Sequence, residues 1–206
     1  MLYALAIACG YVAGSLPFGY WLVRVFRGVD IRTVGSGNIG TSNVWRTFGM
    51  KLGLPVVLLD TLKGFAPAFV FAHTAGYLYG ALAGAGAVVG HAFPLFLRFQ
   101  RGGKMVATAG GVLFALAPEA AGIGLAVWIA VFLLTRYASV ASLSVAVVVP
   151  VTSYLIGDPW PATVFATVTA VGTVILHLPN VRRLLAGTES RSSIKLRAPR
   201  GVRPAA

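Results

Sequence analysis

Long apolar segments dominate this sequence and restrict it to few architectures. The first, LYALAIACGYVAGSLPFGYWLV, extends from Leu2 to Val23 without a charged residue. A helix needs about 20 apolar residues to cross a bilayer. Of the 206 residues, 57% are hydrophobic and 11% are charged, whereas about a quarter of a soluble domain is charged. The sequence therefore predicts an all-α polytopic membrane protein, with residues 1–206 forming a single integral membrane domain.

Hydropathy divides the chain into seven candidate spans. They are Leu2–Val23, Leu52–Ala72, Tyr77–Leu97, Met105–Pro118, Ala120–Thr135, Tyr137–Ile156 and Pro161–Leu178. The first has neither a basic start nor a small-residue cleavage site, so we interpret it as a span rather than a signal peptide. The fourth is much shorter than the others, and such a length is more typical of a re-entrant or buried helix.

The charges between the segments decide how many of them cross. If all seven cross, every Lys and Arg except Lys63 falls on one side, and the connections HTAGY, PEA and GDPW on the other side contain neither. If the fourth segment did not cross, Arg136 and the basic C-terminal segment would lie outside. The positive-inside rule therefore predicts seven transmembrane helices, an extracytoplasmic N-terminus and a cytoplasmic C-terminus. The short fourth span is tolerable beside longer neighbours.

The net charge of +12 could indicate nucleic-acid binding, but its distribution argues against that partner. Residues from about 182 to 206 form a basic segment next to the last span, and we expect it to lie on membrane lipids as a cytoplasmic tail. Each such charge gains about 1 kcal/mol near an anionic leaflet. The single cysteine, Cys9, excludes a disulfide framework. No His, Asp and Glu have the spacing of a metal site, so we expect no metal.

The second span contains Asp60 and Lys63, which share one helix face at i and i+3. An isolated charge in mid-membrane costs about 2.5–3.5 kcal/mol on insertion scales. One interpretation is a buried ion pair that holds this helix against the bundle. The other is a ligand or proton site at the end of a cavity. We interpret His91, in VVGHAFPLF, as a packed histidine ahead of a proline kink.

Several further polar groups converge on the cytoplasmic side of the predicted topology. They are the loop GSGNIGTSN (Gly35–Asn43), Arg46, Lys104 in RGGKMVAT, Ser142 in RYASVASL, and His177 with Asn180 in HLPNVRRLLAGTE. The loop lacks the Gly-Lys-Ser/Thr ending of a nucleotide-binding loop. Each group also has a structural explanation. Lys104 could be a snorkelling lysine, Ser142 could bond its own helix carbonyl one turn back, and His177 and Asn180 could be an interfacial histidine and a helix cap.

This set consists of cations, hydroxyls, amides, one imidazole and glycine N–H groups, and no carboxylate obviously joins it. Hydrogen-bond donors of this kind suit an anion. Exposed N–H groups of a glycine loop at a helix start form an anion site, while Arg adds a planar fork and Lys a point charge. With phosphates bound, catalysis would depend on alignment and charge stabilisation rather than on covalent attack.

The motifs resemble those of the bacterial acyl-phosphate:glycerol-3-phosphate acyltransferase family, of the PlsY type. The resemblance extends over GSLPFGYWL, DIRTVGSGNIGTSNVWRTFG, LLDTLKG, GHAFPLFLRFQRGGKMVAT, RYASVASL and HLPNVRRLLAGTE. It implies a seven-span bundle in the bacterial cytoplasmic (inner) membrane with a cytoplasmic active site. It also implies acyl transfer from acyl-phosphate to the 1-hydroxyl of sn-glycerol 3-phosphate, giving 1-acylglycerol 3-phosphate and phosphate. This is the first acylation of phospholipid synthesis, with no cofactor and with neither acyl-carrier protein nor coenzyme A as direct donor.

The resemblance also assigns roles to residues. Gly35, Ser36, Gly37, Asn38, Gly40 and Asn43 would form the phosphate-binding loop, Arg46, Gly103 and Lys104 would bind substrate phosphates, Ser142 would be a further donor, and His177 and Asn180 would orient glycerol 3-phosphate. Ser36, Arg46 and Ser142 are counted with Lys104, His177 and Asn180 as the catalytic set. Met105 stands where the family usually has glycine, which puts the backbone geometry beside Lys104 in question.

Two other classes of function compete with an acyltransferase. A transporter or flippase for a phosphorylated metabolite would use the same anion site, but it predicts repeats and discontinuous helices. The sequence shows no internal repeat, and its outer connections are nearly devoid of polar binding groups. A structural protein whose basic face only binds lipids would leave the glycine loop without a purpose.

Overall fold

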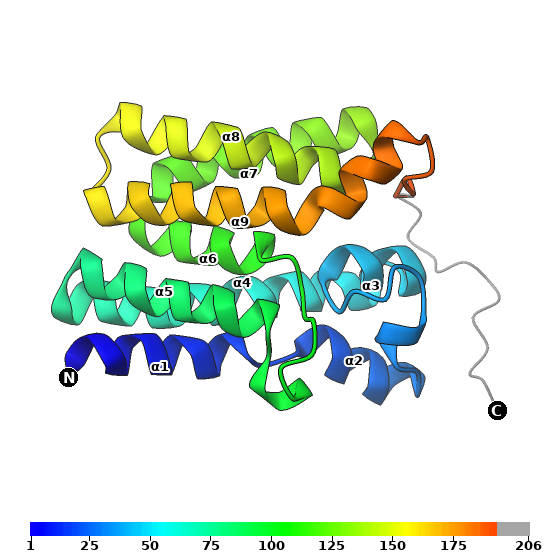
Figure 1. The fold of residues 1–206 in the computed structure, drawn as a ribbon, viewed down its shortest axis with the longest axis horizontal. Coiled ribbons are helices and arrows are strands. Elements are labelled where there is room, and N and C mark those ends of the chain that lie inside the picture. Colours follow the sequence, from blue (N-terminus) through cyan, green and yellow to red (C-terminus); the bar gives the residue numbers. More distant parts are fainter. Residues whose placement is uncertain (193–206) are drawn as a thin grey trace.

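The computed structural model describes residues 1–192, which form helices joined by short connections (Figure 1). The elements are α1 (Leu2–Gly14), α2 (Phe18–Arg27), the 3-10 helix η1 (Ile31–Thr33), α3 (Thr41–Phe48), α4 (Met50–Ala75), α5 (Tyr77–Ala92), the 3-10 helix η2 (Leu95–Leu97), α6 (Val106–Leu116), α7 (Pro118–Thr135), α8 (Ala138–Ile156) and α9 (Trp160–Leu185). The prediction of an all-α membrane protein is confirmed.

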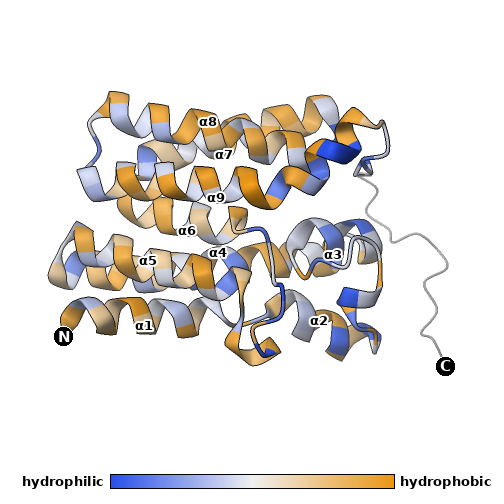
Figure 2. Cartoon of the chain, in the orientation of Figure 1, coloured by the Kyte–Doolittle hydropathy of each residue, from blue (hydrophilic) through white to orange (hydrophobic). Residues whose placement is uncertain are grey.

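Within residues 1–192, six helical segments are long and apolar enough to cross a membrane. The first, Leu2–Arg27, combines α1 and α2, which are separated by a break before Pro17. The shorter apolar helix is α6. At 1.5 Å per residue its 11 residues extend about 16 Å, roughly half of the 30 Å hydrocarbon core. Hydrophilic residues gather at the end of the molecule that carries α3 (Figure 2).

The last long helix does not end where the sequence predicts. The predicted span stops at Leu178, but α9 continues through Pro179 to Leu185. A proline removes one backbone hydrogen bond, and a helix packed among others in a membrane protein tolerates this. Asn180 therefore lies inside the helix, and its interpretation as a helix cap is wrong.

The helices form two walls. In the first wall, α1 packs on α5, and α4 packs on both α5 and α6; in the second, α7 packs on α8 and α8 on α9. Small residues bring α1 and α5 into close backbone contact. A side-chain carbon at Gly14 would lie 2.0 Å from the carbonyl oxygen of Ala87, and one at Gly86 would lie 2.3 Å from that of Ile7. Only glycine permits this approach, the small-residue packing typical of membrane helices.

A small apolar cluster anchors α3 beside the first wall. Val44 and Phe48 of α3 pack with Val23 of α2, Ile31 of η1 and Val56 of α4. These side chains are almost fully buried. Burial of such side chains stabilises the fold by about 1.5–3 kcal/mol each. The cluster thereby holds the start of α3, and the glycine-rich loop before it, against the end of the bundle.

Candidate active site

The loop Gly35–Asn43 is shaped by the asparagine at its end. The side-chain oxygen of the buried Asn43 accepts a hydrogen bond from the Ser36 N–H at 2.9 Å. Its side-chain nitrogen donates to the carbonyls of Val34, at 3.0 Å, and Asn38, at 2.9 Å. A side-chain carbon at Gly35, where φ is +60°, would lie 2.3 Å from the Asn43 side-chain oxygen. Asn43 therefore supports the loop from within.

A second asparagine ties this loop to the connection that carries Lys104. The Asn38 side chain accepts a hydrogen bond from the Gly40 N–H at 2.8 Å and donates to the Gly102 carbonyl at 3.0 Å. Asn38 and Asn43 are predicted members of the phosphate-binding loop, and the hydrogen-bonding groups of their side chains hold that loop in shape. Both residues nevertheless line the cavity described below.

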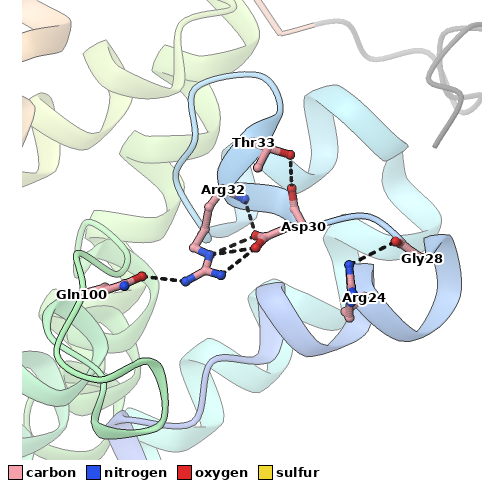
Figure 3. A network of polar contacts seen from close by, with 6 residues as sticks. All are labelled: Arg24, Gly28, Asp30, Arg32, Thr33 and Gln100. Atoms are coloured by element: carbon pink, nitrogen blue, oxygen red, sulfur yellow. Dashed lines mark hydrogen bonds and ion pairs between the residues drawn. The ribbon is translucent and has the colours of Figure 1, made fainter. Parts of the chain in front are cut away.

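Arg32 makes a second link between the same two connections (Figure 3). Its guanidinium forms a bidentate pair with Asp30 and donates to the Gln100 side-chain oxygen at 2.6 Å. Burial is slight here, and the hydrogen bonds from Arg32 lower the pKa of Asp30 below its ordinary value. The pair therefore stays ionised at neutral pH and fixes the position of the Lys104 connection.

The start of α3 faces the cavity with unused hydrogen-bond donors. Gly40, Thr41 and Ser42 line the cavity, and among the described residues no side chain caps this helix. Within residues 1–192 the buried hydroxyl of Thr41 has no hydrogen-bond partner. One turn further along, Arg46 lines the same space, and burial lowers its pKa. A helix start with free N–H groups, a hydroxyl and a guanidinium forms an anion site.

Lys104 reaches the same cavity on a glycine turn. A side-chain carbon at Gly103 would lie 1.9 Å from the His91 ring nitrogen Nε2, so only glycine fits against the imidazole. The Gly103 N–H donates to the His91 carbonyl at 3.0 Å. Lys104 Nζ donates to the side-chain oxygen of Asn180. Burial, followed by the charge of Arg183, lowers the pKa of Lys104 to about 8.

A carboxylate completes this arrangement, contrary to our expectation that none would. Glu189 accepts hydrogen bonds from the Asn180 side-chain nitrogen at 2.6 Å, the Ser139 hydroxyl at 2.9 Å and Arg183 Nε at 2.7 Å. Burial alone would raise the pKa of Glu189, but these hydrogen bonds bring it below its ordinary value. The side chain of Asn180 is thereby fixed, with its oxygen toward Lys104 and its nitrogen toward Glu189.

The signal for Glu189 was present in the sequence, at the end of the motif HLPNVRRLLAGTE. We read the residues after Arg182 as a basic tail and did not consider a contact with the site. In the structure, the chain turns back after α9, and the Ser192 N–H donates to the Arg136 carbonyl at 2.8 Å. The remainder of the predicted tail, residues 193–206, lies outside the described residues.

His177 adds an acceptor to the set of donors. Its buried ring nitrogen Nδ1 lies 2.8 Å from the Thr173 carbonyl. A carbonyl only accepts, so Nδ1 carries the proton and, in the neutral ring, Nε2 is an acceptor. Ser142 donates to the Ala138 carbonyl at 2.7 Å and accepts from Trp128 Nε1 at 3.2 Å. The bond of Ser142 to its own helix carbonyl is confirmed, and its role as a further donor to substrate stays a prediction.

These groups surround one end of a cavity of about 340 Å³ that lies between the two walls. At that end lie Ser36, Asn38, Thr41, Arg46, Lys104, His177, Asn180 and Glu189. The other end is lined by apolar residues of α6, α7, α8 and α9, among them Leu113, Phe114, Leu125, Val149 and Ala166. The cavity is therefore amphipathic, with a cationic, donor-rich end and an apolar end.

Comparison with known proteins decides what kind of protein has this cavity. A profile of the family described as glycerol-3-phosphate acyltransferase matches residues 4–187. The glycerol-3-phosphate acyltransferase of Desulforudis audaxviator (strain MP104C) is 44% identical over 191 residues, which are 93% of this chain and 96% of that protein. That of Brucella canis is 46% identical over 190 residues, 92% of this chain and 93% of the relative. The chain belongs to the glycerol-3-phosphate acyltransferase family.

Two solved structures share the fold of this acyltransferase. They are crystal structures of PlsY, an integral membrane glycerol 3-phosphate acyltransferase, in its glycerol 3-phosphate and lysophosphatidic acid forms. The first superposes with a TM-score of 0.88 at 37% identity, covering 93% of this chain and 96% of the other. The second has a TM-score of 0.86 at 36% identity, with the same coverage. The resemblance to this family that the motifs indicate is confirmed.

Most of the predicted site residues lie in the cavity of this acyltransferase. Ser36, Asn38, Gly40, Asn43, Arg46, Lys104, Ser142, His177 and Asn180 all line one cavity. Gly35, Gly37 and Gly103 do not line it; they allow the turns that bring their neighbours there. Gly37, for example, has φ +69°, a conformation that strongly favours glycine. The functional roles of these residues belong to the proposal below.

The charges of the second span form a buried pair in this acyltransferase. Lys63 Nζ lies 2.7 Å from Asp60 Oδ1 and donates to the Leu16 carbonyl at 2.8 Å. That carbonyl lies at the break between α1 and α2, so the pair holds α4 against the first span. Asp60 also lines the cavity, whereas Lys63 does not. His91 Nδ1 is 3.7 Å from the same carboxylate, and the packed interpretation of His91 fits this position.

The backbone at Met105, next to Lys104, has a conformation that favours glycine. Its φ is +69°, in the left-handed region that side chains disfavour. The Met105 side chain packs beside α9, where a side-chain carbon at Gly172 would lie 3.3 Å from its sulfur. It also contacts the apolar cluster between the two walls. The chain therefore tolerates a strained backbone here in return for apolar packing.

Proposed function

We propose that this glycerol-3-phosphate acyltransferase uses an acyl-phosphate as donor and acylates the 1-hydroxyl of sn-glycerol 3-phosphate. The observation that best supports the proposal is the amphipathic cavity, whose polar end is lined by two cationic groups from different elements. The α3 start with Arg46 forms one, and Lys104 forms the other. Two anion sites suit a reaction in which donor and acceptor each bring a phosphate. In an acyl-phosphate the phosphate is bonded directly to the acyl carbonyl carbon, whereas the phosphates of a phosphopantetheine thioester lie many bonds from it.

The reaction proceeds by direct transfer in this proposal. The 1-hydroxyl oxygen of glycerol 3-phosphate attacks the acyl carbonyl carbon, and the bond from that carbon to the phosphate oxygen breaks. The products are 1-acylglycerol 3-phosphate and inorganic phosphate, which receives the hydroxyl proton. The α3 start with Arg46 neutralises the charge that develops on the departing phosphate, while Lys104, which contacts Asn180, binds the phosphate of glycerol 3-phosphate. Donors of this kind are each worth about 3 kcal/mol of barrier, and alignment of two substrates is worth about 7–11 kcal/mol.

The proton acceptor in this scheme is a phosphate oxygen of the donor. His177 Nε2 accepts a hydrogen bond from the attacking hydroxyl and orients it, while Nδ1–H stays on the Thr173 carbonyl. The pH dependence of kcat distinguishes a phosphate oxygen from His177 as the acceptor of the hydroxyl proton. If the phosphate is the acceptor, the change of kcat with the ionisation of the phosphate persists in His177→Asn, though at a reduced rate. If this pH dependence of kcat disappears in His177→Asn, His177 is the base instead.

We further propose that all seven apolar segments cross the bacterial inner membrane, with the N-terminus outside and the polar end of the cavity in the cytoplasm. The chain reverses direction at Gly76 and at Ala117 (Figure 1). Arg136 and Arg183 lie with the polar end, as the positive-inside rule requires. Cysteines introduced singly at Gly76 and at Arg136 test this topology. A membrane-impermeant thiol reagent should label only the first from outside, in a Cys9→Ser background.

The direct test of the function uses purified protein with labelled glycerol 3-phosphate. We expect lysophosphatidic acid and stoichiometric phosphate with acyl-phosphate, and no product with acyl-coenzyme A or acyl-acyl-carrier protein alone. Lys104→Ala serves as the matched inactive control. Product from a thioester at an equal rate would overturn the donor assignment. Absence of product from every donor, together with uptake of labelled glycerol 3-phosphate into sealed vesicles, would favour the transporter reading.

A further inference from the structure

The apolar part of the cavity is deep enough for a long acyl chain. Along α9, both Asn180 at the polar end and Ala166 at the apolar end line it. Fourteen residues of helix separate them, which is about 21 Å. One leaflet occupies about half of the 30 Å hydrocarbon core, so the cavity is at least as long as the chain of a membrane lipid. A residue midway along this length would decide how much of a chain fits.

Two consecutive glycines in the middle of α6 have different surroundings. A side-chain carbon at Gly111 would lie 2.0 Å from the Thr61 carbonyl oxygen of α4, so close helix packing requires glycine there. The same carbon at Gly110 would meet no atom of residues 1–192 within 4 Å, and Gly110 lines the cavity. Glycine destabilises a helix interior relative to alanine. Packing against other helices therefore does not account for glycine at position 110.

Gly110 lies between the polar end and the apolar end of the cavity. It lies one turn, about 6 Å, beyond Val106, where α6 begins near Lys104. Phe114, a further turn along, lines the apolar end. A large side chain at position 110 would project into the space between the two ends. The beginning of an acyl chain would still fit, whereas the remainder would meet that side chain.

We propose that Gly110 is a specificity-determining residue, which admits long acyl chains because it leaves the middle of the cavity open. The inference rests on the proposed acyl transfer and adds to it the position that limits chain length. In Gly110→Leu, kcat/KM for hexadecanoyl phosphate falls by at least about tenfold, while kcat/KM for hexanoyl phosphate changes by less than about threefold. The KM for glycerol 3-phosphate stays unchanged, because the polar end is untouched.

A matched control is available on the neighbouring helix. Gly122 of α7 also has no atom within 4 Å of an added side-chain carbon, but it does not line the cavity. Gly122→Leu should therefore keep the wild-type ratio between the two donors. Gly110→Ala should fold like the wild type and shift the ratio in the same direction as Gly110→Leu by about twofold. If Gly110→Leu fails to fold, the donor ratio of Gly110→Ala is compared with that of the wild type instead.

The outcomes separate this inference from the donor assignment. Equal loss with short and long donors in Gly110→Leu, or an unchanged ratio in both Gly110 variants, would overturn the role of Gly110. If the wild type is inactive with both acyl-phosphates, the donor assignment fails, and the same two variants are compared with hexanoyl and hexadecanoyl thioesters. The apolar part of the cavity holds the acyl chain and not the leaving group, so the same shift in ratio is expected with the thioesters.

Discussion

The wall of the cavity formed by α1, α4, α5 and α6 differs from the wall formed by α7, α8 and α9 in how closely its helices approach. In the first wall, glycines bring backbones together: side-chain carbons at Gly14 and Gly64 would lie 2.0 and 2.1 Å from backbone oxygens of α5 and α6. In the second wall, Gly122 faces open space, while Gly124 and Gly172 face the side chains of Val149 and Met105. Backbone contacts leave no freedom to adjust, whereas side chains can move.

This difference separates two tasks in one site. The first wall carries the glycine loop and Lys104, which need fixed positions to bind phosphate. The second wall carries Asn180 and Glu189, whose positions depend on side-chain hydrogen bonds, and His177, whose ring is bonded to the Thr173 carbonyl. The contact between Lys104 and Asn180 joins the two walls at the polar end. Precision at the anion site thus comes from backbone packing, whereas the space for the acyl chain lies between α6 of the first wall and the more adaptable helices of the second.

The largest effect should follow from disturbing the close contact of the first wall. In Gly14→Leu the new side chain would overlap the Ala87 backbone, which cannot move away. We expect a destabilisation above about 4 kcal/mol and little folded protein in detergent. Gly122→Leu, in the second wall, should give a normal yield and a monodisperse peak in size-exclusion chromatography. Equal yields of the two variants would contradict the distinction between the walls.

Removal of the charge that joins the walls should abolish most activity while the fold is kept. Lys104→Ala should lower kcat/KM by at least about tenfold and up to about a thousandfold, because it removes a donor aimed at phosphate. Lys104→Arg should retain more activity than Lys104→Ala, since charge is preserved although the geometry changes. Unchanged thermal unfolding of both variants would show that the loss is functional. A near-normal rate for Lys104→Ala would remove this residue from the site.

The network of the second wall should have a smaller effect. Glu189→Gln replaces an acceptor of three hydrogen bonds by an amide, whose NH₂ group would face other donors. Asn180 would lose its fixed orientation, and we expect kcat/KM to fall by about tenfold. Glu119→Gln, at an exposed position at the start of α7, is the matched control and should behave as wild type. Equal kinetics for the two variants would show that Asn180 is positioned without Glu189.

The pH dependence should report the burial of Lys104. Its pKa is lowered to about 8, so the side chain is charged below that pH and neutral above it. Glycerol 3-phosphate is already a dianion there, since the second pKa of a phosphate monoester is about 6. Consequently kcat/KM should decline as pH rises through about 8, while kcat changes less, because bound phosphate restores the charge. Lys104→Arg should remove this alkaline limb. Its persistence in that variant would assign it to another group.

The smallest effect should be seen where the two walls meet at Met105. In Met105→Gly, relief of the left-handed strain gains about 1–2 kcal/mol, and loss of apolar packing costs about the same. Stability should therefore change by less than about 1 kcal/mol and activity by less than about twofold. Met105→Ala keeps the strain and loses the packing, so it should be clearly less stable in thermal unfolding. Equal stability of the two variants would show that φ at this position is not strained.

Much of the site could be predicted because its residues lie in short continuous motifs. The motifs that carry Ser36, Arg46, Lys104, His177 and Asn180 were found from residue type and from the side of the membrane on which charge placed them. Glu189 was missed because a carboxylate within a basic segment has no local pattern that shows where the chain folds back. The contacts by which Asn38 and Asn43 support the loop could not be predicted, because an amide that binds phosphate and one that supports a loop look the same in sequence.

The sequence by itself determined the membrane class, the approximate spans and the family, because hydropathy, charge asymmetry and contiguous motifs are local properties. Only the tertiary structure decided which glycines allow two helices to pack closely and which leave a cavity open. Gly110 and Gly111 are identical neighbours in one helix, yet one faces the cavity and the other faces the α4 backbone. The physical reason is that successive helical residues point about 100° apart, so their surroundings depend on helices distant in sequence.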